Sequence, residues 1–144
     1  MKFKLLLTTA TGAVLLTACD QINQYTQSVP DPSPEQARVA QIAYDHLTRA
    51  EFEQLTENFA PELKTKFAQN NKVLKKFAQD LPQQAYQSKK IVAKHLDHSK
   101  THPARYTVSY EYAYPKNLVQ YDVSFDPADH QNKIRDINIQ IFGE

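Results

Sequence analysis

The segment that decides the fold runs from residue 106 to residue 125 and reads YTVSYEYAYPKNLVQYDVSF. Large apolar or aromatic side chains occupy every second position on both sides of a short turn, Pro115-Lys116-Asn117. Successive side chains of a β-strand point to opposite faces, so this period of two predicts strands with one apolar and one polar face. Two such strands joined by a short turn form a hairpin. We therefore predict an antiparallel hairpin, with Tyr110 near the centre of its apolar face.

Two further segments have strand character. Residues 91 to 96 read IVAKHL and form one candidate strand before the hairpin. After a polar loop from Asp126 to Asn132, three isoleucines alternate with polar residues at Ile137, Ile139 and Ile141. The second half of the chain therefore predicts a four-stranded antiparallel sheet with one apolar face.

Upstream of residue 87, apolar residues recur every three to four positions, which is typical of helices. Ser33-Pro34-Glu35-Gln36 combines a capping hydroxyl, a proline at the first helical position and a glutamine at the third, which is typical of a capping box. The inward stripe predicted for the helix that follows is Val39, Ile42, Ala43, His46, Leu47 and Ala50.

Two more helices are predicted between this helix and the strands. A second helix carries Phe52, Leu55 and Phe59 and is interrupted at Pro61. Beyond the proline, Leu63 and Phe67 continue its apolar face. A third helix begins near Asn71 and ends before Pro82, because proline disfavours helical backbone at the preceding residue. Three helices followed by four strands predict an α+β fold, with helices packed on the apolar face of a curved sheet.

The N-terminus carries a different signal. Lys2 and Lys4 precede a mostly apolar run from Leu5 to Leu16 that is too short to span a bilayer as a helix. The run ends in Leu16-Thr17-Ala18-Cys19, which resembles the lipobox of bacterial lipoproteins. That resemblance implies removal of a signal peptide, residues 1–18, followed by attachment of diacylglycerol and a further acyl chain such as palmitate to Cys19.

Residues 19–33 are polar and broken by prolines, so we interpret them as the lipidated cysteine and a flexible tether to one domain, residues 34–144. The lipoprotein resemblance implies a location in the bacterial cell envelope, anchored on the periplasmic side of a membrane. Asp20 resembles the signal that retains lipoproteins in the inner membrane, and an outer-membrane location stays open.

The order of elements over residues 34 to 142 resembles the nuclear transport factor 2-like, cystatin-like cone. In particular, it resembles the small domain of unknown function that many bacterial lipoproteins carry. The resemblance rests on the aliphatic first helix, on Phe52-Glu53-Gln54-Leu55 followed by Phe59-Ala60-Pro61-Glu62-Leu63, and on the alternating C-terminal strands. It implies a curved sheet wrapped around a helix to enclose a conical pocket.

Composition excludes several kinds of chemistry. The only two glycines are Gly12 and Gly143, so the chain has no glycine-rich phosphate loop, dinucleotide-binding turn or hydrolase nucleophile elbow. Cys19 is the only cysteine, which excludes an intrachain disulfide or a zinc ribbon. Basic and acidic residues number 17 and 16, so the chain lacks the excess charge of a nucleic-acid binder.

No catalytic, metal or cofactor site is predicted. Catalytic members of the conical superfamily hold a carboxylate inside the cone, whereas Glu111, Asp122 and Asp136 lie here on the polar register of their strands. Asp45 and His46 are adjacent on one helix, so their side chains diverge by about 100° and predict no acid–base pair. His95, His98 and His102 fall on a strand and a loop, which predicts solvated histidines rather than zinc ligands.

A row of tyrosines is the most distinctive feature of the sequence. The alternation places five phenols on one sheet face, and His46 is a further candidate beside them: Tyr106, Tyr110, Tyr112, Tyr114 and Tyr121. Buried phenols usually find hydrogen-bond partners, so three interpretations stay open: core, a surface for a partner, or a pocket for a small ligand. We expect Tyr114, beside the turn, to be the least covered of the five.

Charge is distributed unevenly. The predicted second and third helices carry five lysines, which could form a basic face toward anionic headgroups or an acidic partner: Lys64, Lys66, Lys72, Lys75 and Lys76.

The sequence favours a non-enzymatic interaction or ligand-binding module held at the membrane, with an envelope protein or a small apolar ligand as its partner. One alternative is a small-substrate enzyme of the isomerase or hydratase type working in the cone. Another is an inhibitor or immunity protein of an envelope enzyme, using the loop from Asp126 to Asn132.

Overall fold

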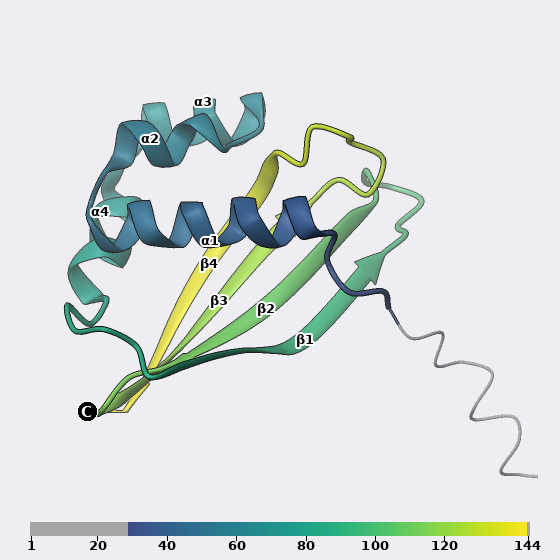
Figure 1. Cartoon of the computed structure of the whole chain (residues 1–144). Coiled ribbons are helices and arrows are strands. Elements are labelled where there is room, and N and C mark those ends of the chain that lie inside the picture. Colours follow the sequence, from purple (N-terminus) through teal and green to yellow (C-terminus); the bar gives the residue numbers. More distant parts are fainter. Residues whose placement is uncertain (1–28, 144) are drawn as a thin grey trace, which may run out of the picture.

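The computed structural model describes residues 29–143, which form four helices followed by a four-stranded sheet (Figure 1). The helices are α1 (Pro34–Thr48), α2 (Phe52–Glu57), α3 (Pro61–Gln69) and α4 (Lys72–Asp80). The strands are β1 (Ser88–Asp97), β2 (Arg105–Ala113), β3 (Asn117–Phe125) and β4 (Ile134–Gly143). They are all antiparallel and lie in the order of the sequence, which confirms the predicted α+β class with helices on a four-stranded sheet. No helix within residues 29–143 has the length and apolarity that crossing a membrane requires.

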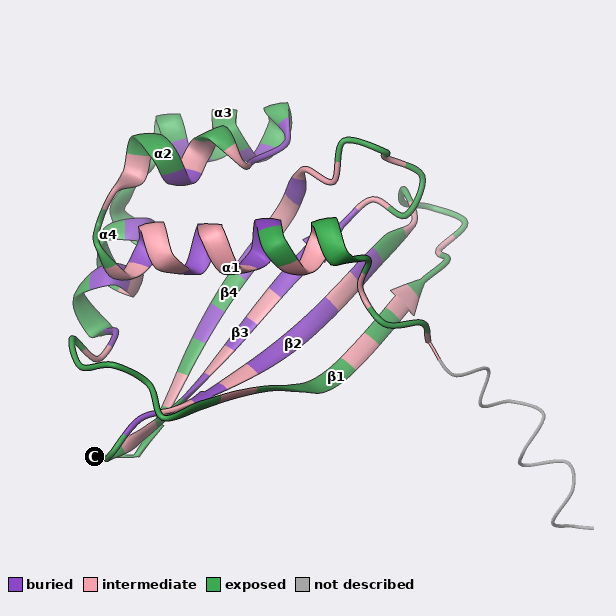
Figure 2. Ribbon diagram, in the orientation of Figure 1, coloured by how far each residue is buried: buried purple, intermediate pink, exposed green. Residues whose placement is uncertain are grey.

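The predicted hairpin is present and its register follows the alternation. Tyr110 lies opposite Tyr121 and Tyr112 lies opposite Val119 in the β2–β3 pair. Their face of the sheet packs against the helices and forms the core, whereas the opposite face carries Glu111, Asp122 and Asp136 on the register predicted for them. Figure 2 shows the buried residues concentrated on the two central strands, β2 and β3.

The strand β1 is longer and more exposed than predicted. It spans Ser88–Asp97 rather than residues 91 to 96, and an irregularity in the register falls between Ile91 and Ala93. β1 is an edge strand, and Ile91 and Val92 remain 39% and 43% exposed. A register irregularity and lysines are common devices that protect an exposed sheet edge from pairing with another chain.

Helix α1 lies across the sheet on its concave side (Figure 1). Its capping box is confirmed, because the Ser33 hydroxyl accepts from the Gln36 backbone N–H at 3.1 Å and the Gln36 side chain accepts from the Ser33 N–H at 3.0 Å. The predicted inward stripe was wrong in part. The residues that the helix buries are Val39, Ala40, Ala43, Tyr44 and Leu47.

The buried stripe is rotated about the helix axis relative to the predicted one. Ala40, Tyr44 and Leu47 recur at helical spacing, and this stripe packs the ring of Tyr44 against the sheet. Ile42 and His46 consequently lie on the flank of the helix, and Ala50 is exposed.

The prediction of one helix running up to Pro61 was also wrong, since α2 ends at Glu57 and α3 begins separately at Pro61. Between them the chain is extended: the Ala60 N–H donates to the Ile134 carbonyl at 2.8 Å, and the Ile134 N–H donates to the Asn58 carbonyl at 2.9 Å. This parallel bridge becomes possible because the residue before a proline favours extended backbone. The fold therefore has four helices, not three.

The two ends of the sheet differ. The loops 98–104 and 126–133 lie at one end, which we call the loop end, and the turn 114–116 and the C-terminus lie at the other, the turn end (Figure 1). Residues 29 to 33, the described part of the predicted tether, contact the loop end. The Tyr106 hydroxyl donates to the Pro30 carbonyl at 2.7 Å, and the Lys94 Nζ lies 2.7 Å from an Asp31 carboxylate oxygen.

Candidate functional site

The tyrosine row lies in the core. The exposed fractions of Tyr106, Tyr110, Tyr112, Tyr114 and Tyr121 range from 0% to 6%. Tyr114, expected to be the least covered, is the most exposed of the five at 6%, but it is buried as well, because Tyr44 of α1 packs against it. The five rings therefore do not form an exposed surface for a partner.

Four of these rings and one that the sequence interpretation missed form a tyrosine cluster: Tyr44, Tyr110, Tyr112, Tyr114 and Tyr121. The Tyr44 and Tyr112 rings are stacked, with centroids 3.9 Å apart and planes 5° from parallel. The ring centroids of Tyr44 and Tyr121 lie 5.2 Å apart, and those of Tyr121 and Tyr110, which are stacked, lie 6.3 Å apart. The space between α1 and the sheet is thus filled by aromatic rings.

The hydroxyls of the cluster are unequally satisfied. The Tyr44 and Tyr114 oxygens lie 2.8 Å apart, and the Tyr112 hydroxyl donates to the Gln41 side-chain oxygen at 3.2 Å. The buried hydroxyls of Tyr110 and Tyr121 have no hydrogen-bond partner among the described residues. A buried hydroxyl without a partner costs about 1 to 3 kcal/mol, so the cluster carries a built-in penalty.

Burial also affects the ionisation of these phenols. Desolvation raises the pKa of every tyrosine in the cluster above its ordinary value of 10.0. Burial raises the pKa of Tyr106, at the loop end, to about 12. All of these phenols are therefore neutral donors and acceptors at physiological pH, and none is a base.

Lys89 closes the cluster on the side of β1. Its Nζ donates to the Gln41 side-chain oxygen at 2.7 Å and lies 4.4 Å from the centre of the Tyr110 ring and 5.5 Å from that of Tyr112. Burial lowers the pKa of this amine, and the nearby Asp45 charge opposes that shift. Gln41 in turn donates to an Asp45 carboxylate oxygen at 2.8 Å. A polar chain from Lys89 through Gln41 to Asp45 thus borders the cluster.

A pocket of about 560 Å³ opens beside the cluster, at the C-terminal end of α1. Its walls come from the C-terminal end of α1 and the residues that follow it, from α4 and the segment that joins α4 to β1, and from the turn after β2. Among its lining residues are Tyr44, Asp45, Thr48, Pro82, Tyr86 and Tyr114. We refer to it as the α1 pocket, and Tyr114 is the one residue of the predicted row that lines it.

Tyr86 forms an aromatic wall of the α1 pocket. Its ring packs edge-on against the rings of Tyr112 and Tyr114, with centroid distances of 4.9 Å and 6.2 Å. The residue is 39% exposed. One part of the ring therefore rests on the cluster while another remains accessible. The pocket combines aromatic rings with a carboxylate and a hydroxyl, as small-molecule sites commonly do.

Asp45 is the acidic group of the α1 pocket, and its position is electrostatically unfavourable. It lies in the last turn of α1, at the negative end of the helix dipole. A carboxylate at that end costs about 0.3 to 1 kcal/mol when it is solvent-exposed. Within the described residues, the only hydrogen bond that the Asp45 carboxylate accepts comes from the neutral side-chain amide of Gln41. The sequence interpretation considered Asp45 only as a partner of His46 and missed this setting.

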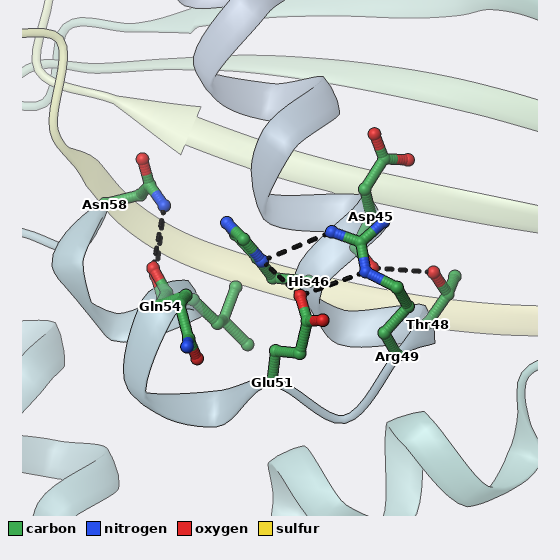
Figure 3. A network of polar contacts seen from close by, with 8 residues as sticks. Asp45, His46, Thr48, Arg49, Glu51, Gln54 and Asn58 are labelled. Carbon is green, nitrogen blue, oxygen red and sulfur yellow. Dashed lines mark hydrogen bonds and ion pairs between the residues drawn. The ribbon is translucent and has the colours of Figure 1, made fainter.

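His46 lies outside both the cluster and the pocket. Its Nδ1 is 2.7 Å from a Glu51 carboxylate oxygen, and the Arg49 Nε lies 3.0 Å from the same oxygen (Figure 3). The hydrogen bond from His46 and the contact with Arg49 hold the pKa of Glu51 below its ordinary value of 4.5. Figure 3 also shows that the Asp45 carboxylate points away from this group, as expected from the predicted divergence of Asp45 and His46.

The same residues cap α1. The Glu51 N–H donates to the His46 carbonyl at 2.9 Å and the Ala50 N–H donates to the Leu47 carbonyl at 3.1 Å, which is the bonding pattern of a Schellman motif. The motif needs a left-handed residue at its turn, and Ala50 adopts φ 56° there. The hydrogen bond between His46 and Glu51 therefore stabilises a cap whose turn residue is strained.

Other predicted groups stay apart. His95 lies within β1, and His98 and His102 follow it. Residues 29–143 contain no group of three His, Asp or Glu residues placed to hold a metal ion. The lysines of α3 and α4 are exposed, and of these Lys76 pairs with Asp80 at 2.6 Å. Cys19 and Asp20 lie outside the described residues.

A second pocket, of about 310 Å³, lies at the loop end. Arg135 lines it and is held by carboxylate oxygens of Glu62 and Asp126, both at 3.2 Å. Its guanidinium is thus already neutralised by two carboxylates from different parts of the chain. This arrangement fastens β4 to α3 and to the loop that precedes β4.

Comparison with protein-family models, with curated proteins and with solved structures finds no match to this chain.

Proposed function

We propose that this chain is a lipid-anchored protein of the bacterial envelope whose domain acts by binding a small molecule rather than by catalysis. The observation that carries the proposal is the tyrosine cluster, which fills the space between α1 and the sheet where a conical enzyme would hold its substrate. The α1 pocket, beside the cluster and open to solvent, is the binding site in this proposal.

The filled interior supports binding over catalysis. A base for proton abstraction works best in an apolar cavity that raises its pKa. The three acids of β2, β3 and β4 named above lie on the polar face of the sheet, opposite the core. The phenols that line the interior have raised pKa values and cannot serve as bases near neutral pH.

The fold supports the proposed relationship to nuclear transport factor 2-like domains in outline. A curved antiparallel sheet covers one side of α1, as in such a cone (Figure 1), and Tyr44 is among the residues that α1 buries. We propose that this chain is a version of that cone whose pocket has been filled by side chains.

The anchor is the second part of the proposal. The complete lipobox at Cys19 supports lipidation, and Asp20 supports retention in the inner membrane. Val29 lies ten positions after Cys19, and a chain of that length reaches at most about 35 Å. Because Pro30 and Asp31 are bound to the loop end, we expect the loop end to face the membrane and the turn end, with the α1 pocket, to face away.

Cys19→Ser tests the anchor. We expect the wild-type chain to fractionate with membranes and to require detergent for release, because several acyl chains anchor a protein effectively permanently. The serine variant cannot form the thioether and should keep its signal peptide and lose the lipid. The readouts are membrane fractionation and the intact mass. Thr8→Ser, in the apolar run but outside the lipobox, is the matched control. A Cys19→Ser variant with the mass and fractionation of the wild type would refute the anchor.

A further inference from the structure

We propose that the α1 pocket takes a small organic ammonium ion, that is, a protonated primary amine joined to an apolar group, and that Asp45 is its counter-ion. The inference rests on the proposed binding function and adds the chemical class of the ligand. Four observations support it: the position of Asp45, the basic groups near it, the aromatic wall and the size of the pocket.

Asp45 lies at the C-terminal end of α1 and lines the pocket. Its carboxylate adds negative charge to the carbonyl end of α1, where a cation is favoured. The Asp45 backbone carbonyl already accepts from the Thr48 hydroxyl at 2.8 Å and from the Arg49 N–H at 3.2 Å. These bonds fix the last turn and hold the side chain at the pocket wall. A bound cation would interact with the carboxylate and with the helix end at the same time.

The basic side chains near Asp45 are engaged elsewhere. Arg49 also lines the pocket, and its guanidinium is bound to Glu51 at 3.0 Å. Lys89 donates to Gln41 and rests over the Tyr110 ring. Among the described residues, none supplies Asp45 with an ion pair within 4.0 Å, although eight basic or histidine side chains have carboxylate partners of their own. Within residues 29–143, Asp45 therefore has no direct ion pair, and Lys89 reaches it only at longer range, with Gln41 between them.

The aromatic wall supplies a second attraction for a cation. Ring faces carry negative potential, and an ammonium ion within about 6 Å of a tyrosine ring is stabilised. Tyr86 and Tyr114 both line the pocket, and Tyr86, 39% exposed, offers the more accessible of the two rings. Ala78 and Pro82 supply an apolar part of the wall for the rest of the ligand.

The size of the pocket suits an organic molecule better than a bare metal ion. A volume of about 560 Å³ is in the range of sites that hold small organic molecules. Anions of similar size are disfavoured, because Asp45 and the helix end would repel a carboxylate or phosphate. The combination selects a cation of organic size.

The test compares three probes of matched shape and different charge: benzylamine, benzyl alcohol and benzoate. The full-length lipidated chain in detergent micelles is titrated with each, binding is followed by ligand-observed NMR, and empty micelles provide the blank. We expect the wild type to bind benzylamine about tenfold or more tightly than benzyl alcohol, because hydrogen bonds to charged groups are the strong ones, and to bind benzoate least.

Asp45→Asn is the decisive variant. It keeps the shape and the acceptor for Gln41 but removes the charge, so benzylamine binding should weaken about tenfold or more while benzyl alcohol binding stays unchanged. The variant should unfold at the same temperature as the wild type or higher, because a charge at the wrong helix end has been removed. Glu57→Gln is the matched control: it also removes an exposed acid from the last turn of a helix, but outside the pocket.

The outcomes separate the two proposals. If benzyl alcohol and benzoate bind as well as benzylamine, or if Asp45→Asn has no effect on benzylamine, the pocket binds small molecules but the cation inference is wrong. If none of the three probes binds, both the inference and the binding role of the pocket are overturned. The membrane fractionation of Cys19→Ser is independent of all three results.

Discussion

At the scale of single residues, the two orphan hydroxyls of the tyrosine cluster invite a direct comparison. Tyr110 and Tyr121 keep ring packing but have no partner for their oxygens, whereas Tyr44 and Tyr114 satisfy each other. Replacing a tyrosine by phenylalanine removes the hydroxyl and leaves the ring. The sign of the stability change therefore reports whether the hydroxyl is bonded.

We expect Tyr121→Phe to stabilise the protein by about 1 kcal/mol, because it removes an unpaired buried hydroxyl. Tyr44→Phe should destabilise it by about 1 kcal/mol, since it breaks one hydrogen bond and leaves the Tyr114 hydroxyl alone. Chemical denaturation of both variants measures the two changes. A loss of stability in Tyr121→Phe equal to that in Tyr44→Phe would mean that the Tyr121 hydroxyl is bonded, for instance to a buried water.

At the scale of elements, the strands were predicted better than the helices, and the reason is physical. In a strand the side-chain period is two, so the alternation around Tyr110 fixes which face each residue occupies. On a helix the buried stripe is broad, and its centre depends on which large residue the sheet accommodates. Tyr44 and His46 are only two positions apart, and the packing of Tyr44 against Tyr112 decides the rotation in favour of Tyr44.

The candidate site was predicted less completely for a related reason. Tyr114 and Asp45 are 69 positions apart in the sequence and meet at the pocket only because the C-terminal part of α1 packs beside the turn that follows β2. Tyr86 comes from an irregular segment with no period to interpret. The spacing of residues along the chain carries no information on such long-range contacts. The one available signal was local: Gln41 and Asp45 are four residues apart on one helix, which brings their side chains together.

The Schellman cap of α1 gives a prediction at the same scale. Ala50→Gly should stabilise the protein by about 1 kcal/mol, because glycine adopts left-handed backbone without the cost that Cβ imposes. Ala37→Gly, the same change inside α1, should destabilise it by about 1 kcal/mol, because glycine is a poor helix former. Thermal and chemical denaturation of the pair measure the opposite signs. Two losses of similar size would show that Ala50 is not under strain.

At the scale of the whole molecule, the buried phenols predict how the protein responds to alkali. An acid whose folded pKa is raised binds more protons in the folded state than in the unfolded state above its ordinary pKa. The stability that depends on the neutral phenols is therefore complete below pH 10.0 and falls as the pH rises above it. Tyr106, with its pKa at about 12, contributes in the same direction.

We expect the phenolate absorbance of these tyrosines to rise together with the loss of far-ultraviolet circular dichroism, in one cooperative alkaline transition. Their ionisation and unfolding are the same event, because each charged phenolate would otherwise be buried. The two signals are recorded on one pH series. Phenolate absorbance for most of the tyrosines with unchanged circular dichroism would show that the rings ionise within the folded protein and that the cluster is wet.

The order of the elements along the chain has a consequence for when the protein can fold. Each strand pairs only with its neighbours in sequence, so the sheet forms from local contacts, which favour rapid folding. Helix α1, however, is made first and has its buried stripe covered by strands that are made last. A chain still being synthesised or exported from its N-terminus holds α1 with no surface to pack on. We therefore expect folding to begin only when β2 and β3 have emerged, which would keep the chain extended during the export that the proposed envelope location requires.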